Sequence, residues 1–234
     1  MATLEGKRVE HELPGRQGRL LFAYLAANRR RATPRSELMD AVWPEGLPPA
    51  PDSALSALAS KLRRLVGQER LEGRSDLRLR LSDDAWIDVE AAAEALHRAE
   101  AALGRSDWPD AWVAARIAQH IAVRPFVAGE DVPWIEDRRR QLEETYLRAL
   151  ELTAHASLRI GGGEMDTAER SARSLVRCAP FRETGHRYLM EVLAARGNRA
   201  EALNVYEQLR SLLREELGTT PSPATKSLHS ALLG

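Results

Sequence analysis

Residues 53–67, SALSALASKLRRLVG, constrain the fold of this chain more than any other stretch. Apolar residues recur there every three or four positions, which predicts an amphipathic helix that ends at Gly67. At about 100° per residue the two faces separate clearly. The apolar face holds Leu55, Leu58, Ala59, Leu62, Leu65 and Val66, and the polar face holds Ser53, Ser56, Ser60, Lys61, Arg63 and Arg64. The first face is predicted to enter a core, which leaves the second free.

Two shorter helices are predicted before this one. In residues 13–28 the apolar spacing is helical and stops at Asn28. In the next segment, TPRSELMDAVWPEG, Thr33 is the expected N-cap, Pro34 the first helical position and Pro44 the stop. The third helix is expected to take its N-cap from Asp52 or Ser53.

After Gly67 the hydrophobic period changes from helical to two. Leu77, Leu79 and Leu81 alternate with Arg78 and Arg80, and the residues before them, GRSD, are typical of a turn. This pattern predicts a β-hairpin with arginines on its outer side. Three helices followed by a basic hairpin predict a winged helix-turn-helix, in which the last helix enters the major groove of DNA.

The charge is unevenly divided between the two parts of the chain. The whole sequence has 34 Lys and Arg residues and 34 Asp and Glu residues, but residues 1–82 hold 15 basic and 10 acidic ones. The remainder is therefore acidic by the same margin. A basic first part joined to an acidic second part is expected if only the first part meets phosphate.

From residue 86 onward the sequence is rich in Ala, Leu, Glu and Arg and predicts helices that break at Gly104, Pro125, Gly161–Gly163, Pro180, Gly197 and Gly218. Similar residues recur 34 positions apart, as Ala168 and Ala202 do. This period is typical of tetratricopeptide (TPR) repeats, in which pairs of helices stack. We therefore predict a mainly α chain, with a winged-helix domain in residues 1–85 and a TPR-like domain in residues 86–234.

The first domain resembles a known family. The order LPGRQGRLLFAYL, TPRSELMDAVWPEG and SALSALASKLRRLVG is similar to the OmpR-type winged helix of actinobacterial SARP and AfsR-like regulators. Members usually begin with a four-stranded sheet, whereas here LEGKRVEHEL allows a hairpin at most, so either the sheet is reduced or the chain is trimmed. The resemblance implies that six residues lie nearest the groove, Ser53, Ser56, Ala57, Ser60, Lys61 and Arg64, and that five lie near phosphates, Arg31, Thr33, Arg35, Arg74 and Arg78. Arg63 is also expected among the DNA-binding residues.

The second domain resembles the bacterial transcriptional activation domain that follows the winged helix in those regulators. The matching segments are WIDVEAAAEAL, PWIEDRRRQLEETYLRALE and GNRAEALNVYEQLRSLLREELGTTPSPATKSLHSALL. The resemblance implies an activator that binds tandem direct repeats in double-stranded DNA near a promoter and contacts RNA polymerase. We expect one protomer to be poorly specific, so that two copies associate on adjacent repeats.

Several features of the sequence also allow a second interpretation. The basic side of the 53–67 helix could be only a solvated surface, and Arg29–Arg31 could cap a helix through its macrodipole rather than bind phosphate. The loop WPEGLPPAP is the expected polymerase contact, or its prolines only brace the turn. The repeats could bind peptides or partner proteins, pack against the first domain or pair protomers. The alternative function is thus a TPR-type interaction or sensor module with the winged helix as scaffold.

Enzymatic function is not expected. The six histidines lack the spacing of metal ligands, and IGGGEMD lacks the Lys-Ser/Thr of a phosphate-binding loop. Cys178 is the single cysteine, which excludes an internal disulfide. The sequence shows no secretory signal and no run near the roughly 18 apolar residues of a membrane span. We expect a cytoplasmic protein without cofactor or metal.

Overall fold

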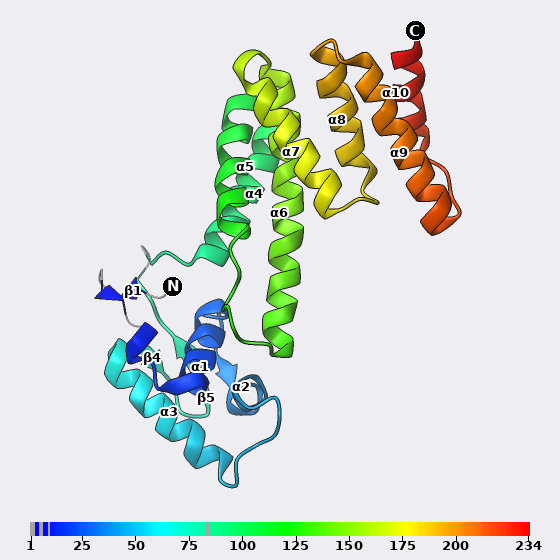
Figure 1. Ribbon diagram of the computed structural model, residues 1–234. Helices are drawn as coiled ribbons and strands as arrows, with labels where there is room; N and C mark the ends of the chain where they lie inside the picture. Colours follow the sequence, from blue (N-terminus) through cyan, green and yellow to red (C-terminus); the bar gives the residue numbers. More distant parts are fainter. Residues whose placement is uncertain (1–2, 5–6, 9, 83–84) are drawn as a thin grey trace. The chain divides into compact units, whose positions relative to one another are not determined.

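The computed structural model describes all residues except 1–2, 5–6, 9 and 83–84, and its fold is mainly α (Figure 1). Contacts between Cα atoms divide the chain into two compact units. Unit 1 contains Met1–Ile87 and Pro125–Arg139, and unit 2 contains Asp88–Arg124 and Arg140–Gly234. Unit 1 is therefore discontinuous in sequence, because a 15-residue segment from the middle of the helical region belongs to it.

The described residues of unit 1 form three complete α-helices, the start of a fourth and two small antiparallel sheets. Its elements are β1 (Thr3–Leu4), β2 (Lys7–Arg8), the 3-10 helix η1 (Glu10–Glu12), α1 (Gly15–Ala27), β3 (Thr33–Pro34), α2 (Arg35–Val42), α3 (Pro51–Val66), β4 (Leu71–Glu72) and β5 (Asp76–Leu79). Strand β1 pairs with β2, and the second sheet has the order β3-β5-β4. The predicted hairpin is present as β4 and β5, and β3 adds a third strand that the sequence did not predict.

Leucines from α1, α2, α3, β4 and β5 form one core. Leu55 and Leu62 of α3 are completely buried, and Leu77 and Leu79 of β5 are 1% exposed. The helical period of α3 and the period-two pattern of β5 therefore deliver their side chains to the same cluster. Leu81 lies beyond the end of β5 and packs against this core from its edge.

The starts of α2 and α3 differ from the predicted capping. The N-cap of α2 is Pro34, without a side-chain cap, because Thr33 is recruited into β3 and pairs with Leu77. Helix α3 begins two residues earlier than predicted, with Ala50 as N-cap. Asp52 and Ser53 thus lie inside the first turn and cap nothing. The predicted stop is confirmed, since Gly67 follows α3 with a φ of +104°.

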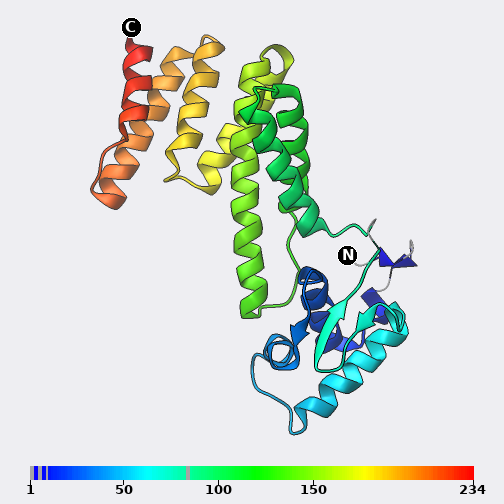
Figure 2. The same ribbon diagram turned by 180° about the vertical axis from the view of Figure 1, so that it is seen from behind.

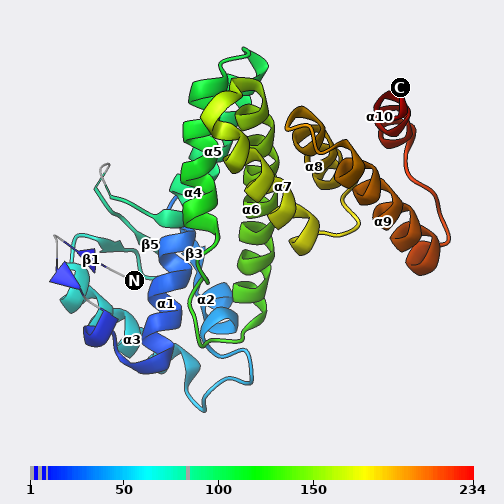
Figure 3. The ribbon, with the colours of Figure 1, turned by 45° about the horizontal axis from the view of Figure 1, so that its top comes forward.

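Unit 2 is a succession of helices. They are α4 (Asp88–Gly104), α5 (Trp108–Ala122), α6 (Pro133–Ile160), the 3-10 helix η2 (Gly162–Glu164), α7 (Met165–Cys178), α8 (Glu183–Ala195), α9 (Arg199–Leu217) and α10 (Pro223–Leu233). Figures 1 and 2 show α4, α5 and the later part of α6 side by side. Figure 3 shows α8, α9 and α10 following one another in the same way. The first seven residues of α6 belong to unit 1.

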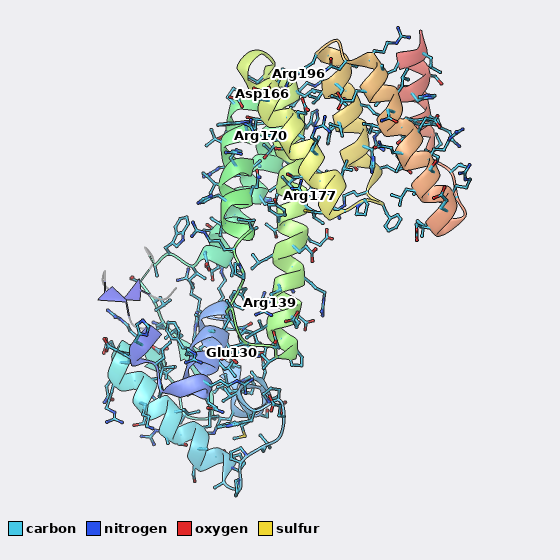
Figure 4. The ribbon with its side chains drawn as sticks, viewed as in Figure 1. Glu130, Arg139, Asp166, Arg170, Arg177 and Arg196 are labelled. Atoms are coloured by element: carbon cyan, nitrogen blue, oxygen red, sulfur yellow. The ribbon has the colours of Figure 1, made fainter. Side chains whose placement is uncertain are left out.

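The helices of unit 2 end close to the predicted breaks, and small residues fill their contacts. Helices α7 and α9 begin 34 residues apart, and Ala168 and Ala202, which have the same spacing, are both completely buried. At one tip, Arg196 donates to Asp166 Oδ1 at 2.6 Å and so ties the end of α8 to the start of α7 (Figure 4). The assignment of this unit to TPR repeats, and the domain limits 1–85 and 86–234, stay predictions.

Candidate nucleic-acid interface

Helix α3 has an outer face made of small and basic side chains. All six residues predicted to lie nearest the groove on this face are exposed: Ser53, Ser56, Ala57, Ser60, Lys61 and Arg64. The opposite face is committed to the core of unit 1. Short hydroxyls beside long cations suit a surface that approaches both base edges and phosphates.

The beginning of this face is organised by Arg35 from the first turn of α2. The Arg35 guanidinium donates to Asp52 Oδ1 at 3.1 Å, to the Asp52 carbonyl at 2.7 Å and to Ser56 Oγ at 3.0 Å. It also donates to the Arg74 carbonyl at 3.3 Å, in the turn of the hairpin. Arg35 therefore joins α2, α3 and the hairpin. Asp52, which was predicted only as a possible N-cap, places a carboxylate at this end of the face.

Arg63 and Arg64 are adjacent in sequence and have different environments. Arg63 Nε donates to the Leu71 carbonyl at 3.0 Å, and its terminal nitrogen donates to the Gly73 carbonyl at 2.6 Å. Arg64 is exposed on the outer face. Arg63 thus fixes the hairpin against α3, while Arg64 is presented to solvent.

Arg31 is held at the edge of unit 1 by Glu37. The Arg31 guanidinium donates to Glu37 Oε2 at 2.9 Å and also contacts Oε1, and Tyr24 Oη donates to Glu37 Oε1 at 2.5 Å. The hydrogen bonds from Arg31 lower the pKa of Glu37, against the opposing effect of burial. Burial and the bond to Glu37 raise the pKa of Tyr24. Glu37 is consequently an anion that orients Arg31, whose side chain is still 49% exposed.

Two of the predicted phosphate contacts are placed differently. The Thr33 side chain is completely buried, and its hydroxyl has no hydrogen-bond partner among the described residues. Thr33 therefore does not reach a phosphate in this structure. Arg78 is half-buried, and its Nε donates to the Arg29 carbonyl at 3.1 Å. Arg74 is exposed in the hairpin turn, as predicted.

Arg78 also lines a basic pocket on unit 1, which was not predicted from the sequence. The pocket has a volume of about 390 Å³ and is lined by Arg29, Arg30, Arg78, Leu79, Arg80 and Leu81. Arg80 is paired with Glu72 at 3.1 Å. The pocket thus gathers four arginines, two from the residues that follow α1 and two from β5 and the residue after it. Arg31 is not among the residues that line it. The sequence contained one indication of this pocket, the alternation of leucine and arginine at residues 77–81, which predicted arginines on the outer side of the hairpin.

A comparison with protein families decides the assignment of the chain. A family model described as "Bacterial transcriptional activator domain" matches residues 87–233. The chain belongs to this family. The bacterial transcriptional activator domain thus covers all the helices of unit 2 and includes the segment 125–139 that packs in unit 1.

Similar proteins extend over both units. Regulatory protein AfsR of Streptomyces griseus is 31% identical over 217 residues, which are 93% of this chain and 22% of that protein. Transcriptional regulatory protein EmbR of Mycobacterium tuberculosis is 25% identical over 243 residues, which cover 99% of this chain and 60% of EmbR. The chain therefore spans about a fifth of the length of AfsR and three fifths of that of EmbR.

The fold is shared with a solved structure titled "Mycobacterium tuberculosis EmbR in complex with low affinity phosphopeptide". Its TM-score is 0.87 at 22% identity, and the match covers 99% of this chain and 62% of the EmbR chain. The predicted membership among SARP and AfsR-like transcriptional regulators and the mainly α fold are confirmed. The OmpR type of the first unit stays a prediction. Across the described residues, no helix has the length and apolar character needed to cross a membrane.

Proposed function

We propose that this transcriptional regulator binds double-stranded DNA through the outer face of α3 and activates transcription from tandem direct repeats near a promoter. The observation that carries the proposal is the separation of α3 into a buried leucine face and an exposed face of serines, Lys61 and Arg64. A helix with its core side fixed and its basic side open has the form of a recognition helix. The basic excess of residues 1–82 supports the same conclusion.

Within this face, Arg64 is the proposed base-reading residue, because an exposed arginine can bond both acceptors of a guanine. Lys61, Ser60, Ala57 and Ser53 make smaller and more permissive contacts. Ser56 is already bonded to Arg35 and to the Asp52 carbonyl, so it acts with Arg35 rather than alone. Since one protomer offers few contacts that discriminate between bases, specific binding is proposed to need two copies on adjacent repeats.

Phosphate contacts are proposed for Arg31, Arg35, Arg74 and Arg78, with Arg63 fixing the hairpin on which two of them lie. The basic pocket adds Arg29, Arg30 and Arg80 to this set. Contacts of this kind position a protein on the duplex and carry no sequence information directly.

The loop between α2 and α3 is the proposed contact with RNA polymerase. Leu47 is 54% exposed in it, and Pro44, Glu45 and Pro49 are exposed as well. An apolar side chain held outward by neighbouring prolines is suited to a protein partner. A cytoplasmic location is part of the same proposal, since DNA and polymerase are found there.

Selection of bound sites from random duplexes tests the proposal. Wild type should enrich a repeated half-site, and a Lys61→Ala, Arg64→Ala variant should lose the enrichment. A matched variant, Arg98→Ala with Lys226→Ala, removes the same charge from exposed positions of unit 2 and should retain it. Equal enrichment by both variants would reject DNA recognition by α3.

The second candidate function is a protein-interaction module. It is favoured by exposed apolar residues on α5, where Val113 is 46% exposed and Ile117 is 36% exposed at a spacing of one helical turn. Partner capture that is equal for wild type and for the Lys61→Ala, Arg64→Ala variant, together with no DNA enrichment by wild type, would support it.

A further inference from the structure

Residues 125–139 lie between two stretches of unit 2 in the sequence and yet pack in unit 1. Val132 and Ile135 from this segment form a cluster with Leu20 of α1, and all three are at most 1% exposed. Phe126, Val127 and Trp134 pack around it. The segment therefore adds a second apolar cluster to the unit that contains α3.

Polar contacts fix the same segment in one geometry. The Glu130 carboxylate is 8% exposed and accepts from Arg16 Nε at 2.7 Å and from Arg19 at 3.3 Å, both on α1. Arg139 braces the loop from inside by donating to the carbonyls of Phe126 at 3.1 Å, Val127 at 3.0 Å and Glu130 at 2.9 Å. Figure 4 shows Glu130 and Arg139 on neighbouring parts of this segment, at the start of α6. A nearly buried carboxylate with two arginine partners marks a built contact and not a passive linker.

Trp134 connects the segment to the residues that orient Arg31. Its indole N–H donates to the Ala41 carbonyl at 3.1 Å, at the end of α2. The rings of Trp134 and Tyr24 meet edge to face, with centroids 4.9 Å apart and planes at 87°. Tyr24 in turn donates to Glu37, and Glu37 accepts from Arg31. A continuous series of contacts thus runs from Trp134 through Tyr24 and Glu37 to Arg31.

We infer that residues 125–139 are a positioning element of the DNA-contacting surface, in which Trp134 sets the Tyr24 ring and Tyr24 sets Glu37, so that Arg31 is held toward a phosphate. This inference rests on the proposed DNA binding. Arg31 is the contacting residue, and Trp134 and Tyr24 act through it. A segment that only covered α1 would affect the stability of unit 1 and leave the number of phosphates bound unchanged.

The number of phosphates bound is measured by the slope of log K against log salt, on a duplex selected with the whole 234-residue chain. Each phosphate contact contributes about 0.9 to this slope, so Arg31→Ala should lower it by about 0.9. Tyr24→Phe, which removes one oxygen, should lower the slope by a substantial part of this amount. Trp134→Ala should lower the slope at least as much as Tyr24→Phe does. In the Arg31→Ala background, Tyr24→Phe should change neither slope nor affinity. Tyr146→Phe, at a half-buried tyrosine of unit 2, is the matched control and should have no effect.

A loss of folded protein lowers the apparent affinity without changing the slope, which separates positioning from a purely structural role. An unchanged slope in Tyr24→Phe beside a lowered slope in Arg31→Ala would overturn the inference and leave DNA binding intact. An unchanged slope in Arg31→Ala would overturn it too. A measurement without DNA gives a second test, because Tyr24→Phe should increase the fast motion of the Arg31 Nε–H bond in nitrogen-15 relaxation of the free protein. Unchanged motion would contradict the inference even if the proposed function failed.

Discussion

Leu20 is the residue at which the discontinuity of unit 1 can be tested most sharply. It is completely buried and lies in a cluster with Val132 and Ile135, more than 100 positions away in the sequence. Leu20→Ala removes one methine and two methyl carbons from this cluster and should cost about 3 kcal/mol of the free energy of unfolding, as buried Leu→Ala changes do. Ile135→Ala should cost a similar amount for the same reason.

The informative quantity is the coupling between the two substitutions. If the two side chains pack against each other, the double variant should lose less free energy of unfolding than the sum of the two single losses. The expected difference is about 1 kcal/mol, which is typical of residues in contact. Leu193→Ala, at a buried leucine of unit 2, is the control partner for Leu20→Ala and should be additive within about 0.5 kcal/mol.

Native-state hydrogen exchange of the α1 amides is the appropriate assay, because it reports the free energy of opening for this unit rather than for the whole chain. Both single variants should lower the protection of α1. If Ile135→Ala leaves α1 protection at its wild-type value, or if Leu20 and Ile135 are additive, the segment does not belong to the core of unit 1 and the reasoning fails.

Three further predictions concern local features. Gly73→Ala should destabilise the hairpin by at least about 1–2 kcal/mol, because Gly73 has a φ of +90° and an added Cβ would lie 1.8 Å from the Asp76 carbonyl oxygen; wild-type exchange of the β5 amides in this variant would contradict it. Burial lowers the pKa of His155, and Arg159 and Arg148 act in the same direction. The contribution of neutral His155 to stability is therefore lost as the pH falls below about 6.5, the pKa of the unfolded state. His155→Gln should flatten this decline in thermal melts between pH 8 and pH 5, and an equally steep decline in the variant would contradict the prediction. Burial raises the pKa of Glu191, so its carboxylate is destabilising at pH 7, and Glu191→Gln should raise the denaturation midpoint there, whereas a lower midpoint would show that Arg159 and Arg187 outweigh the burial.

Local patterns predicted much of unit 1. The spacing of leucines in residues 53–66 and the alternation at 77–81 identified α3 and the hairpin, since both patterns depend only on the geometry of one element. Strand β3 has two residues and no local signal, because it exists through its pairing with β5. The pairing of Thr33 in this strand is the reason why the predicted N-cap was wrong and why the Thr33 side chain, a predicted phosphate contact, is completely buried.

The distribution of roles among the arginines could not be read from the sequence. Arg63 and Arg64 are equally basic, and only the position of the hairpin decides that Arg63 bonds its carbonyls. The packing of residues 125–139 is likewise a long-range property. Leu20 and Leu21 are adjacent on α1, and their spacing alone does not tell that they enter different clusters, because neighbours about 100° apart can share one apolar face. Leu21 enters the core with α3, and Leu20 requires Val132 and Ile135.

The central claim, that the outer face of α3 binds DNA, is tested most directly by the salt dependence of binding to a tandem-repeat duplex. The account predicts that Lys61→Ala with Arg64→Ala lowers the slope of log K against log salt, by about 1.8 if both residues grip phosphate and by about 0.9 if Arg64 reads a base instead. The Arg98→Ala, Lys226→Ala control should keep the wild-type slope. A slope and an affinity that are the same in wild type and in the α3 variant would contradict the claim.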